Sequence, residues 1–321
     1  MTEIVSLPDV SIASLGAAPH EGLHGGVASI GNFDGVHRGH TSLLKQTRRL
    51  ADKLSGPAIA CLFDPHPIAI LRPDAAPKRL TSVAERARRM KPFGIDYLVV
   101  CRTSRDLLGL SAHEFFDALI RDNLKCRGMV EGENFCFGKG RGGDVQLLRT
   151  LCAEHQIEFE IAEMASAAGQ SISSTRIRDL LAAGEVAAAA QMMATPHRIS
   201  GVVVHGDARG RTIGFPTANL EQIDVVIPGA GVYAGHAIIK EQSYQAAIHI
   251  GKSPTFQSGL ANKVEVHLLD FSADLYGQTL TVEFIDQIRG IIRFESADAL
   301  TTQLHKDLQS VRQLLDQEPK T

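Results

Sequence analysis

Hydrophobic and polar positions in the first half of the chain follow two alternating patterns. Short runs of β-branched and apolar residues predict strands, and apolar residues at helical spacing, as around Leu44, Leu50 and Leu54, predict helices between them. Strands that alternate with helices are typical of a parallel sheet covered on both faces, which is an α/β fold. The predicted strands are residues 27–30, 57–63, 95–100, 128–131 and 157–162.

The pattern changes at Thr195 and Pro196. An Ala-rich helical stretch predicted from Arg176 to about Ala194 ends there, because proline disfavours helix in the residue before it. We therefore predict two domains, residues 1–194 and 195–321. The second is all-β, since β-rich runs separated by glycines and prolines favour an antiparallel barrel or a sandwich. Those runs are 198–204, 231–239, 244–250, 263–269 and 279–285, and Ser296 is predicted to cap a C-terminal amphipathic helix that packs on them.

Length and composition agree with a folded protein of about two domains. Hydrophobic residues make up 44% and charged residues 21% of the 321, as in soluble globular proteins. The formal net charge of −3 gives no positive excess, so neither nucleic acid nor a membrane surface is expected as a partner. No membrane-span or signal-peptide pattern is present, which predicts a cytoplasmic protein. The five cysteines lack CxxC spacing and are interpreted as reduced thiols, with no zinc site.

One stretch of the first domain is locally basic. Such a run can steer a polyphosphate, but helices commonly carry charged residues on a solvated face. We interpret the run as a solvated helix face and assign it no site. Its members are Arg72, Lys78, Arg79, Arg86, Arg88, Arg89 and Lys91.

Residues 28–40, ASIGNFDGVHRGH, join a predicted strand to a predicted helix. Gly31 and Gly35 allow a tight turn, and a helix that begins near Gly39 offers free N–H groups to a phosphate. His37 and His40 are three residues apart, so on a helix both can donate hydrogen bonds to a polyphosphate oxygen. A glycine turn or a histidine pair alone is often structural. Their combination resembles the HxGH signature of the nucleotidyltransferase superfamily.

A second candidate phosphate clamp is ISSTRIR, residues 172–178. Ser174 and Thr175 precede a predicted helix that starts with Arg176, so hydroxyls, backbone N–H groups and a guanidinium come together. Without the segment at 28–40, the same residues would indicate only a good helix N-cap.

In the second domain, residues 206–220, GDARGRTIGFPTANL, carry candidate ligands. Their glycines let backbone N–H groups approach phosphates, and the Thr217 hydroxyl and Asn219 carbonyl are hard oxygen ligands suited to Mg²⁺. Glu265 on a later strand can act as general base for a substrate hydroxyl, although a solvated strand glutamate is the commoner case. The GKS triplet at 251–253 lacks the P-loop glycine and is interpreted as a strand end and turn.

The chain resembles the bacterial bifunctional riboflavin kinase/FAD synthetase (FMN adenylyltransferase) family from about Ala28 to the C-terminal helix. Its motifs occur in the same order as in that family. The resemblance implies a Rossmann-like nucleotidyltransferase domain with a parallel sheet, followed by an antiparallel β-barrel riboflavin kinase domain with a terminal helix. The motifs are GNFDGVHRGH at 31, FDPHP at 63, RLTS at 79, GENFCFGKGRGGD at 132, ISSTRIR at 172, GRTIGFPTAN at 210, GVYAG at 231, IGKSPTF at 250, and EVHLLDF with DLYG at 265 and 274.

The resemblance also implies two successive reactions. The second domain would phosphorylate riboflavin to FMN with ATP and Mg²⁺, with Thr217 and Asn219 at the metal and Glu265 as the base. The first domain would combine FMN with a second ATP to give FAD and pyrophosphate, with His37 and His40 at the reacting phosphate.

The resemblance also implies which molecules the chain binds and which further residues contact them. Riboflavin, FMN, FAD and ATP are the implied partners, and the chain is expected to be a monomer or a weak homo-oligomer. Phe63 and Asn134 would contact the flavin. The implied ATP- and phosphate-binding residues are Gly31, Asn32, Phe33, Gly39, Ser174, Thr175, Arg176, Gly210, Thr212, Gly214, Pro216, Thr217 and Asn219.

Two departures from the family pattern lie in the kinase half. His249 stands where the family usually has asparagine, and GIIR at 290–293 replaces a more polar, acid-containing stretch. Both changes can loosen flavin or nucleotide binding there. They leave open a monofunctional FMN adenylyltransferase with a flavin-binding but kinase-inactive barrel. A non-catalytic flavin-binding regulatory protein is a separate alternative, against which the retained catalytic residues argue.

Overall fold

The computed structural model describes residues 1–7, 21–162, 172–206, 213–252 and 262–317. The chain divides into two compact units, the first comprising Met1–Pro77 and Ser82–Ile172 and the second Lys78–Thr81 and Ser173–Thr321. The helical residues just before the expected boundary at 194 therefore pack with the second unit. The extent of the functional domains, 1–194 and 195–321, stays a prediction.

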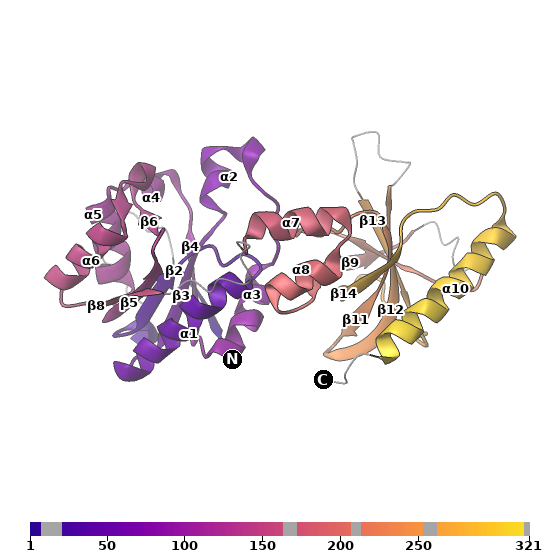
Figure 1. Cartoon of the computed structure of the whole chain (residues 1–321), viewed down its shortest axis with the longest axis horizontal. Helices are drawn as coiled ribbons and strands as arrows, with labels where there is room; N and C mark the ends of the chain where they lie inside the picture. Colours follow the sequence, from indigo (N-terminus) through magenta and orange to yellow (C-terminus); the bar gives the residue numbers. More distant parts are fainter. Residues whose placement is uncertain (8–20, 163–171, 207–212, 253–261, 318–321) are drawn as a thin grey trace. The chain divides into compact units, whose positions relative to one another are not determined.

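A six-stranded parallel sheet forms the centre of the first unit, in the order β1-β4-β3-β2-β5-β8 (Figure 1). The five predicted strands are confirmed, with ends that shift by at most two residues. The edge strand β1 was not predicted, because Val5 and Leu7 are its only buried residues. The strands are β1 (Glu3–Leu7), β2 (Val27–Ile30), β3 (Ala58–Asp64), β4 (Tyr97–Arg102), β5 (Gly128–Gly132) and β8 (Glu158–Ala162), with a separate ribbon of β6 (Cys136–Phe137) and β7 (Gly143–Asp144).

Helices cover both faces of this sheet. They are α1 (Arg38–Lys53), α2 (Pro67–Leu71), α3 (Val83–Met90), α4 (Arg105–Gly109), α5 (Ala112–Phe115), the π-helix η5 (Phe116–Asn123) and α6 (Val145–Glu154), with short 3-10 helices η2 (Glu21–Leu23), η3 (Pro73–Ala75), η4 (Lys91–Phe93) and η6 (Lys139–Arg141). Alternate strand residues face opposite layers. Ala60 and Leu62 pack with α1 and α3, whereas Ile59 and Cys61 pack with η5 and α6. The α/β prediction is therefore confirmed.

The helical stretch predicted from Arg176 to about Ala194 is two helices, α7 (Ser174–Ala183) and α8 (Val186–Met193). Gly184 separates them with a φ of 85°, a left-handed conformation that glycine adopts without strain. Both helices share a hydrophobic core with barrel residues such as Phe284. The predicted helical stretch is confirmed, and its division at Gly184 was not predicted, because periodicity does not distinguish a glycine stop from an ordinary position in an Ala-rich run.

Six antiparallel strands close into a barrel in the second unit, in the order β10-β13-β12-β11-β14-β9. Its interior is filled by apolar side chains such as Ile248, Val264 and Val282. The all-β prediction is confirmed as a barrel, while β10 was missed because four residues carry no clear period. The strands are β9 (His197–Val204), β10 (Ala218–Glu221), β11 (Gly231–Ile239), β12 (Gln242–Lys252), β13 (Asn262–Leu268) and β14 (Thr279–Arg289).

The predicted C-terminal helix is confirmed as α10 (Ala297–Asp316), the yellow helix in Figure 1. The Ser296 side chain accepts a backbone N–H of its first turn, as expected of an N-cap. Val311 packs against the outer face of the barrel. Asp307 is buried and binds Arg289 of β14 at 2.7 Å, so an ion pair also fixes the helix to the barrel.

Candidate active sites

The turn between β2 and α1 has an unusual backbone. Phe33 (φ 47°) and Val36 (φ 45°) are left-handed, as is Gly35 between them (φ 85°). This conformation is rare for non-glycine residues and an outlier for β-branched ones, and such strain is concentrated at functional sites. The Val36 N–H donates to the Phe33 carbonyl at 3.0 Å and closes the turn. The next residue, His37, is the N-cap of α1.

His37 and His40 stack on each other at the start of α1. Their ring centroids are 3.7 Å apart with planes inclined by 17°, and the Phe33 ring meets His40 edge-on at 5.2 Å. Gly39 permits this arrangement, because a Cβ there would lie 2.9 Å from His37 Nδ1. The structure thus brings together the histidines singled out by their spacing. Within the described residues, both Nδ1 atoms are buried without a hydrogen-bond partner.

Burial keeps both rings of this pair uncharged. It lowers the pKa of His37 from 6.5 to about 4, against the opposing effect of the Asp34 charge. Burial, together with His37 and Arg86, holds the pKa of His40 well below 6.5. A neutral imidazole has one N–H donor and one acceptor nitrogen. At neutral pH the pair can therefore donate hydrogen bonds to phosphate oxygens without carrying charge.

The residues before the strained turn are fixed by neighbouring strands and loops. The Gly31 N–H donates to the Cys61 carbonyl of β3 at 2.9 Å. The Asn32 amide nitrogen lies 2.7 Å from His66 Nε2, and His66 Nδ1 accepts the Ile68 N–H at 3.0 Å as the N-cap of α2. Asn32 therefore links the turn to the start of α2.

Helix α3 contradicts the interpretation of the basic run as a solvated face. Arg86 and Arg89 are only 5% and 4% exposed. Arg88, between them, is exposed at its side chain and pairs with Glu85 at 2.7 Å. Residues three apart share a helix face, so Arg86 and Arg89 lie on the inner face of α3. The solvated interpretation was wrong for these two arginines.

Phe63, one of the predicted flavin contacts, lies at the end of β3 in a series of aromatic rings. It contacts Phe115 at 6.1 Å, Phe115 contacts Phe137 at 5.8 Å, and Phe137 stacks on Phe135 at 5.7 Å between ring centroids. Asn134 is exposed beside Phe135. The FDPHP and GENFCFG motifs thus contribute to one aromatic cluster, and flavin binding there stays a prediction.

Ser174, Thr175 and Arg176 form the first turn of α7 in the second unit. The Ser173 side chain accepts the Arg176 N–H at 3.3 Å, so the motif does cap a helix. The first turn of a helix has N–H groups free to bind an anion. The role of these three residues in phosphate binding stays a prediction.

Asn219, Glu265 and His249 occupy one row across three strands of the barrel. Asn219 of β10 is opposite Glu265 of β13, and Glu265 is opposite His249 of β12. Directly opposed residues on antiparallel strands place their side chains on the same face. The structure therefore adds His249 to two residues singled out in the sequence.

Both carboxylate oxygens of Glu265 are bound. Oε2 lies 3.0 Å from His249 Nδ1, and Oε1 lies 2.9 Å from Lys263 Nζ. The hydrogen bond from His249, aided by Lys263 and opposed by burial, lowers the pKa of Glu265 from 4.5 to about 2. Glu265 is therefore ionised at neutral pH. In the sequence, His249 was interpreted only as a departure that loosens binding. In the structure, it binds the carboxylate of Glu265, the candidate base.

Asn219 carries a buried polar atom that the protein does not satisfy. Within the described residues, its Oδ1 has no hydrogen-bond partner. Gly206 leaves room for the amide, because a Cβ there would lie 2.2 Å from Asn219 Nδ2. A buried amide oxygen is a hard ligand and fits Mg²⁺ or a water bound to it.

The other residues predicted around this site are only partly described. Gly214 has a φ of 87°. The Pro216 carbonyl lies 2.8 Å from His267 Nδ1, and Thr217 is partly exposed just before β10. Gly210 and Thr212 lie outside the described residues.

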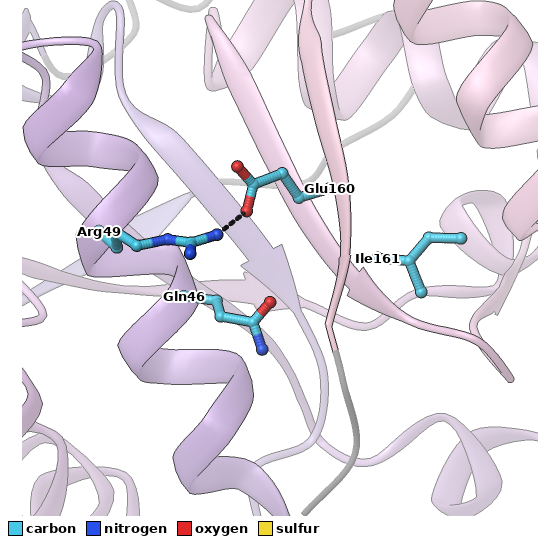
Figure 2. Close-up of a pocket in the computed structure, with 4 residues that line it drawn as sticks. All are labelled: Gln46, Arg49, Glu160 and Ile161. Atoms are coloured by element: carbon cyan, nitrogen blue, oxygen red, sulfur yellow. Dashed lines mark hydrogen bonds and ion pairs between the residues drawn. The ribbon is translucent and has the colours of Figure 1, made fainter.

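A pocket of about 490 Å³ lies between α1 and β8 (Figure 2). Gln46, Arg49, Glu160 and Ile161 line it. Arg49 pairs with Glu160 at 2.6 Å, so the two charged side chains of the pocket neutralise each other. None of the predicted site residues is among those four, and we assign the pocket no role.

Models of two families match the chain in sequence. FAD synthetase matches residues 20–176 and riboflavin kinase matches residues 193–315. A bifunctional riboflavin kinase/FMN adenylyltransferase of Escherichia coli strain K12 is 39% identical over 303 residues, which cover 94% of this chain and 96% of that protein. A protein of the same name from Pseudomonas fluorescens is 37% identical and covers 90% of this chain and 93% of its own length.

A solved structure is similar over nearly the same length. A crystal structure described as a macrolide-efflux protein from Streptococcus pneumoniae has a TM-score of 0.83 at 30% identity, covering 96% of this chain and 98% of that one. In the part of this chain that the structure describes, no helix combines the length and apolar character needed to cross a membrane. Because both family models and near full-length relatives match, the chain belongs to the bifunctional riboflavin kinase/FMN adenylyltransferase family, as its motifs predicted.

Proposed function

We propose that this chain makes FAD from riboflavin in two ATP-dependent steps, riboflavin phosphorylation followed by adenylyl transfer to FMN. Family membership supports both activities. The chain retains residues predicted to act as a base and as a phosphate clamp, which a purely flavin-binding protein does not need. Within this proposal it works in the cytoplasm as a monomer or weak homo-oligomer, without nucleic acid or membrane.

In the first unit, a phosphate oxygen of FMN attacks the α-phosphorus of ATP. The bond from that phosphorus to the bridging oxygen of the β-phosphate breaks, and pyrophosphate leaves with the bonding electrons. His37 and His40 donate N–H groups to the oxygens that gain charge, and the start of α1 adds its free N–H groups. The family resemblance also implies phosphate contacts from Ser174, Thr175 and Arg176, which begin a helix of the second unit and stay a separate prediction.

In the second unit, the 5′-hydroxyl oxygen of riboflavin bonds to the γ-phosphorus of ATP and ADP leaves. Glu265 accepts the hydroxyl proton. Its pKa of about 2 makes it a weak base, so we expect it mainly to orient the hydroxyl and to take the proton once the new bond has largely formed. Thr217 and Asn219 would hold Mg²⁺, which when bound neutralises phosphate charge.

The proposal is supported mainly by the positions of buried polar atoms that lack a hydrogen-bond partner. Of the seven such atoms among the described residues, three belong to predicted site residues, namely Nδ1 of His37, Nδ1 of His40 and Oδ1 of Asn219. Each unsatisfied buried group costs about 1 to 3 kcal/mol of folding free energy. Their coincidence with the predicted chemistry supports two sites built for phosphate and metal ligands.

The test is a time course of the purified chain with riboflavin, ATP and Mg²⁺, with riboflavin, FMN and FAD separated by chromatography. FMN that rises and then gives way to FAD is expected, and a parallel reaction started from FMN should give FAD directly. FAD from FMN without any product from riboflavin would refute the kinase half. No product in either reaction would refute both halves. Omission of Mg²⁺ with added EDTA should stop FMN formation.

A further inference from the structure

The two buried arginines of α3 both reach the strained turn before His37. Arg86 donates to the Asn32 carbonyl at 3.1 Å and pairs with the Asp34 carboxylate at 3.0 Å. Arg89 donates to the Gly35 carbonyl at 3.1 Å. One short helix thus holds two backbone carbonyls of a turn more than 50 residues earlier in the chain.

These two carbonyls belong to the peptide groups that matter most for the turn. The φ angle of a residue describes rotation about its N–Cα bond. This rotation turns the peptide group that precedes the residue. The Asn32 carbonyl is in the peptide group before Phe33, and the Gly35 carbonyl is in the one before Val36. Phe33 and Val36 are the turn's two non-glycine residues with positive φ. Each arginine therefore holds the peptide group whose rotation would release one strained residue.

The positions of both histidines depend on this turn. Phe33 packs edge-on against His40, and Val36 is joined directly to His37. If either peptide group relaxed, the Phe33 ring or the start of α1 would shift, and the stacked pair would lose its geometry. Displacement of a catalytic group by about 1 Å can cost roughly 10²-fold in rate.

From these contacts we propose that Arg86 and Arg89 are positioning residues for adenylyl transfer, which hold the left-handed turn so that His37 and His40 meet the α-phosphate. This inference rests on the proposed function of the first unit. It gives the buried arginines of the basic run a role other than direct contact with the nucleotide, since their guanidinium groups are already bound to the turn.

The helix supplies its own matched control. Arg86→Lys and Arg89→Lys keep the charge but lose the planar fork that reaches two acceptors at once. Arg88→Lys makes the same change at the exposed arginine between them. For each variant, kcat and the KM for ATP are measured for FAD formation from FMN, together with FMN formation from riboflavin and the thermal midpoint by circular dichroism.

We expect Arg86→Lys to lower kcat for FAD formation by about 10²-fold and Arg89→Lys by about tenfold, with a smaller change in KM. Arg88→Lys should match the parent, and FMN formation should be unchanged in all three. Kcat values equal to the parent in both inner variants, even with a lowered thermal midpoint, would overturn the proposal. Loss of folding in both, under conditions where Arg88→Lys is folded, would equally overturn it, since the arginines would then be scaffold residues. A parent that makes no FAD would instead refute the proposed function.

Discussion

The two candidate sites differ in how far the protein already satisfies their polar groups. At the start of α1, the stacked histidines are buried and uncharged, and neither Nδ1 has a partner among the described residues. On the barrel, Glu265 is ionised and both its oxygens are bound, by His249 and by Lys263. One site has neutral rings whose Nδ1 atoms lack partners among the described residues, whereas the other has a charged group that its neighbours bind.

This difference indicates different contributions to catalysis. Donors fixed before the ligand arrives stabilise charge that develops in the transition state, usually a large effect. A carboxylate with a lowered pKa is a weak base and contributes mainly by orientation, which is a smaller effect. Loss of a histidine should therefore cost more than loss of Glu265, and loss of a partner of Glu265 should cost least.

The largest expected effect is that of His40→Ala. It removes one donor of the stacked pair, so FAD formation from FMN should fall by about 10³-fold. FMN formation from riboflavin in the same preparation should be unchanged, because its proposed residues lie on the barrel. Chromatographic rates for both reactions check this. A parallel loss of both activities would show that the two sites are not independent.

Glu265→Gln should have the next largest effect. The substitution keeps the shape of the side chain but removes its charge and its ability to accept a proton, so FMN formation should fall by about 10²-fold. Supplied FMN should still be converted to FAD. If FMN formation persists at the parent rate, Glu265 is not the base.

His249→Ala should lower FMN formation by about tenfold, because Glu265 keeps Lys263 but loses its other donor. His249→Asn is the matched variant, since its amide also has an N–H donor and the family pattern described above usually has asparagine there. Steady-state kcat should be nearly restored in His249→Asn. A lower kcat in His249→Asn than in His249→Ala would contradict this role.

The fold was largely predictable because its signals are local. Runs such as 231–239 show a β-rich composition within a few residues, and Ser296 is a typical N-cap residue directly before its helix. The misses lie where the signal is weak or depends on tertiary context. β10 is too short to show a period, and the stop at Gly184 lies within an Ala-rich run.

The sites were predictable only as far as their residues are close in sequence. The spacing of His37 and His40 was enough to place both on one turn. The contact of His249 with Glu265 depends on the register between β12 and β13, which periodicity does not show. Arg86 was misinterpreted for the same reason, because its partner turn lies far back in the chain.

The smallest expected effect is on stability, and it follows from the pKa of His37. Burial lowers this pKa to about 4 in the folded chain, against about 6.5 when unfolded. Between these values the unfolded chain binds the proton more strongly, so the free energy of unfolding should fall as pH falls through this window. Between pH 7 and pH 5.5 the loss from His37 should be about 1 kcal/mol. His37→Gln cannot titrate, so its urea-unfolding free energy, measured by circular dichroism, should fall less than the parent's over that range. Parallel curves for the two proteins would show that His37 is not held uncharged by burial.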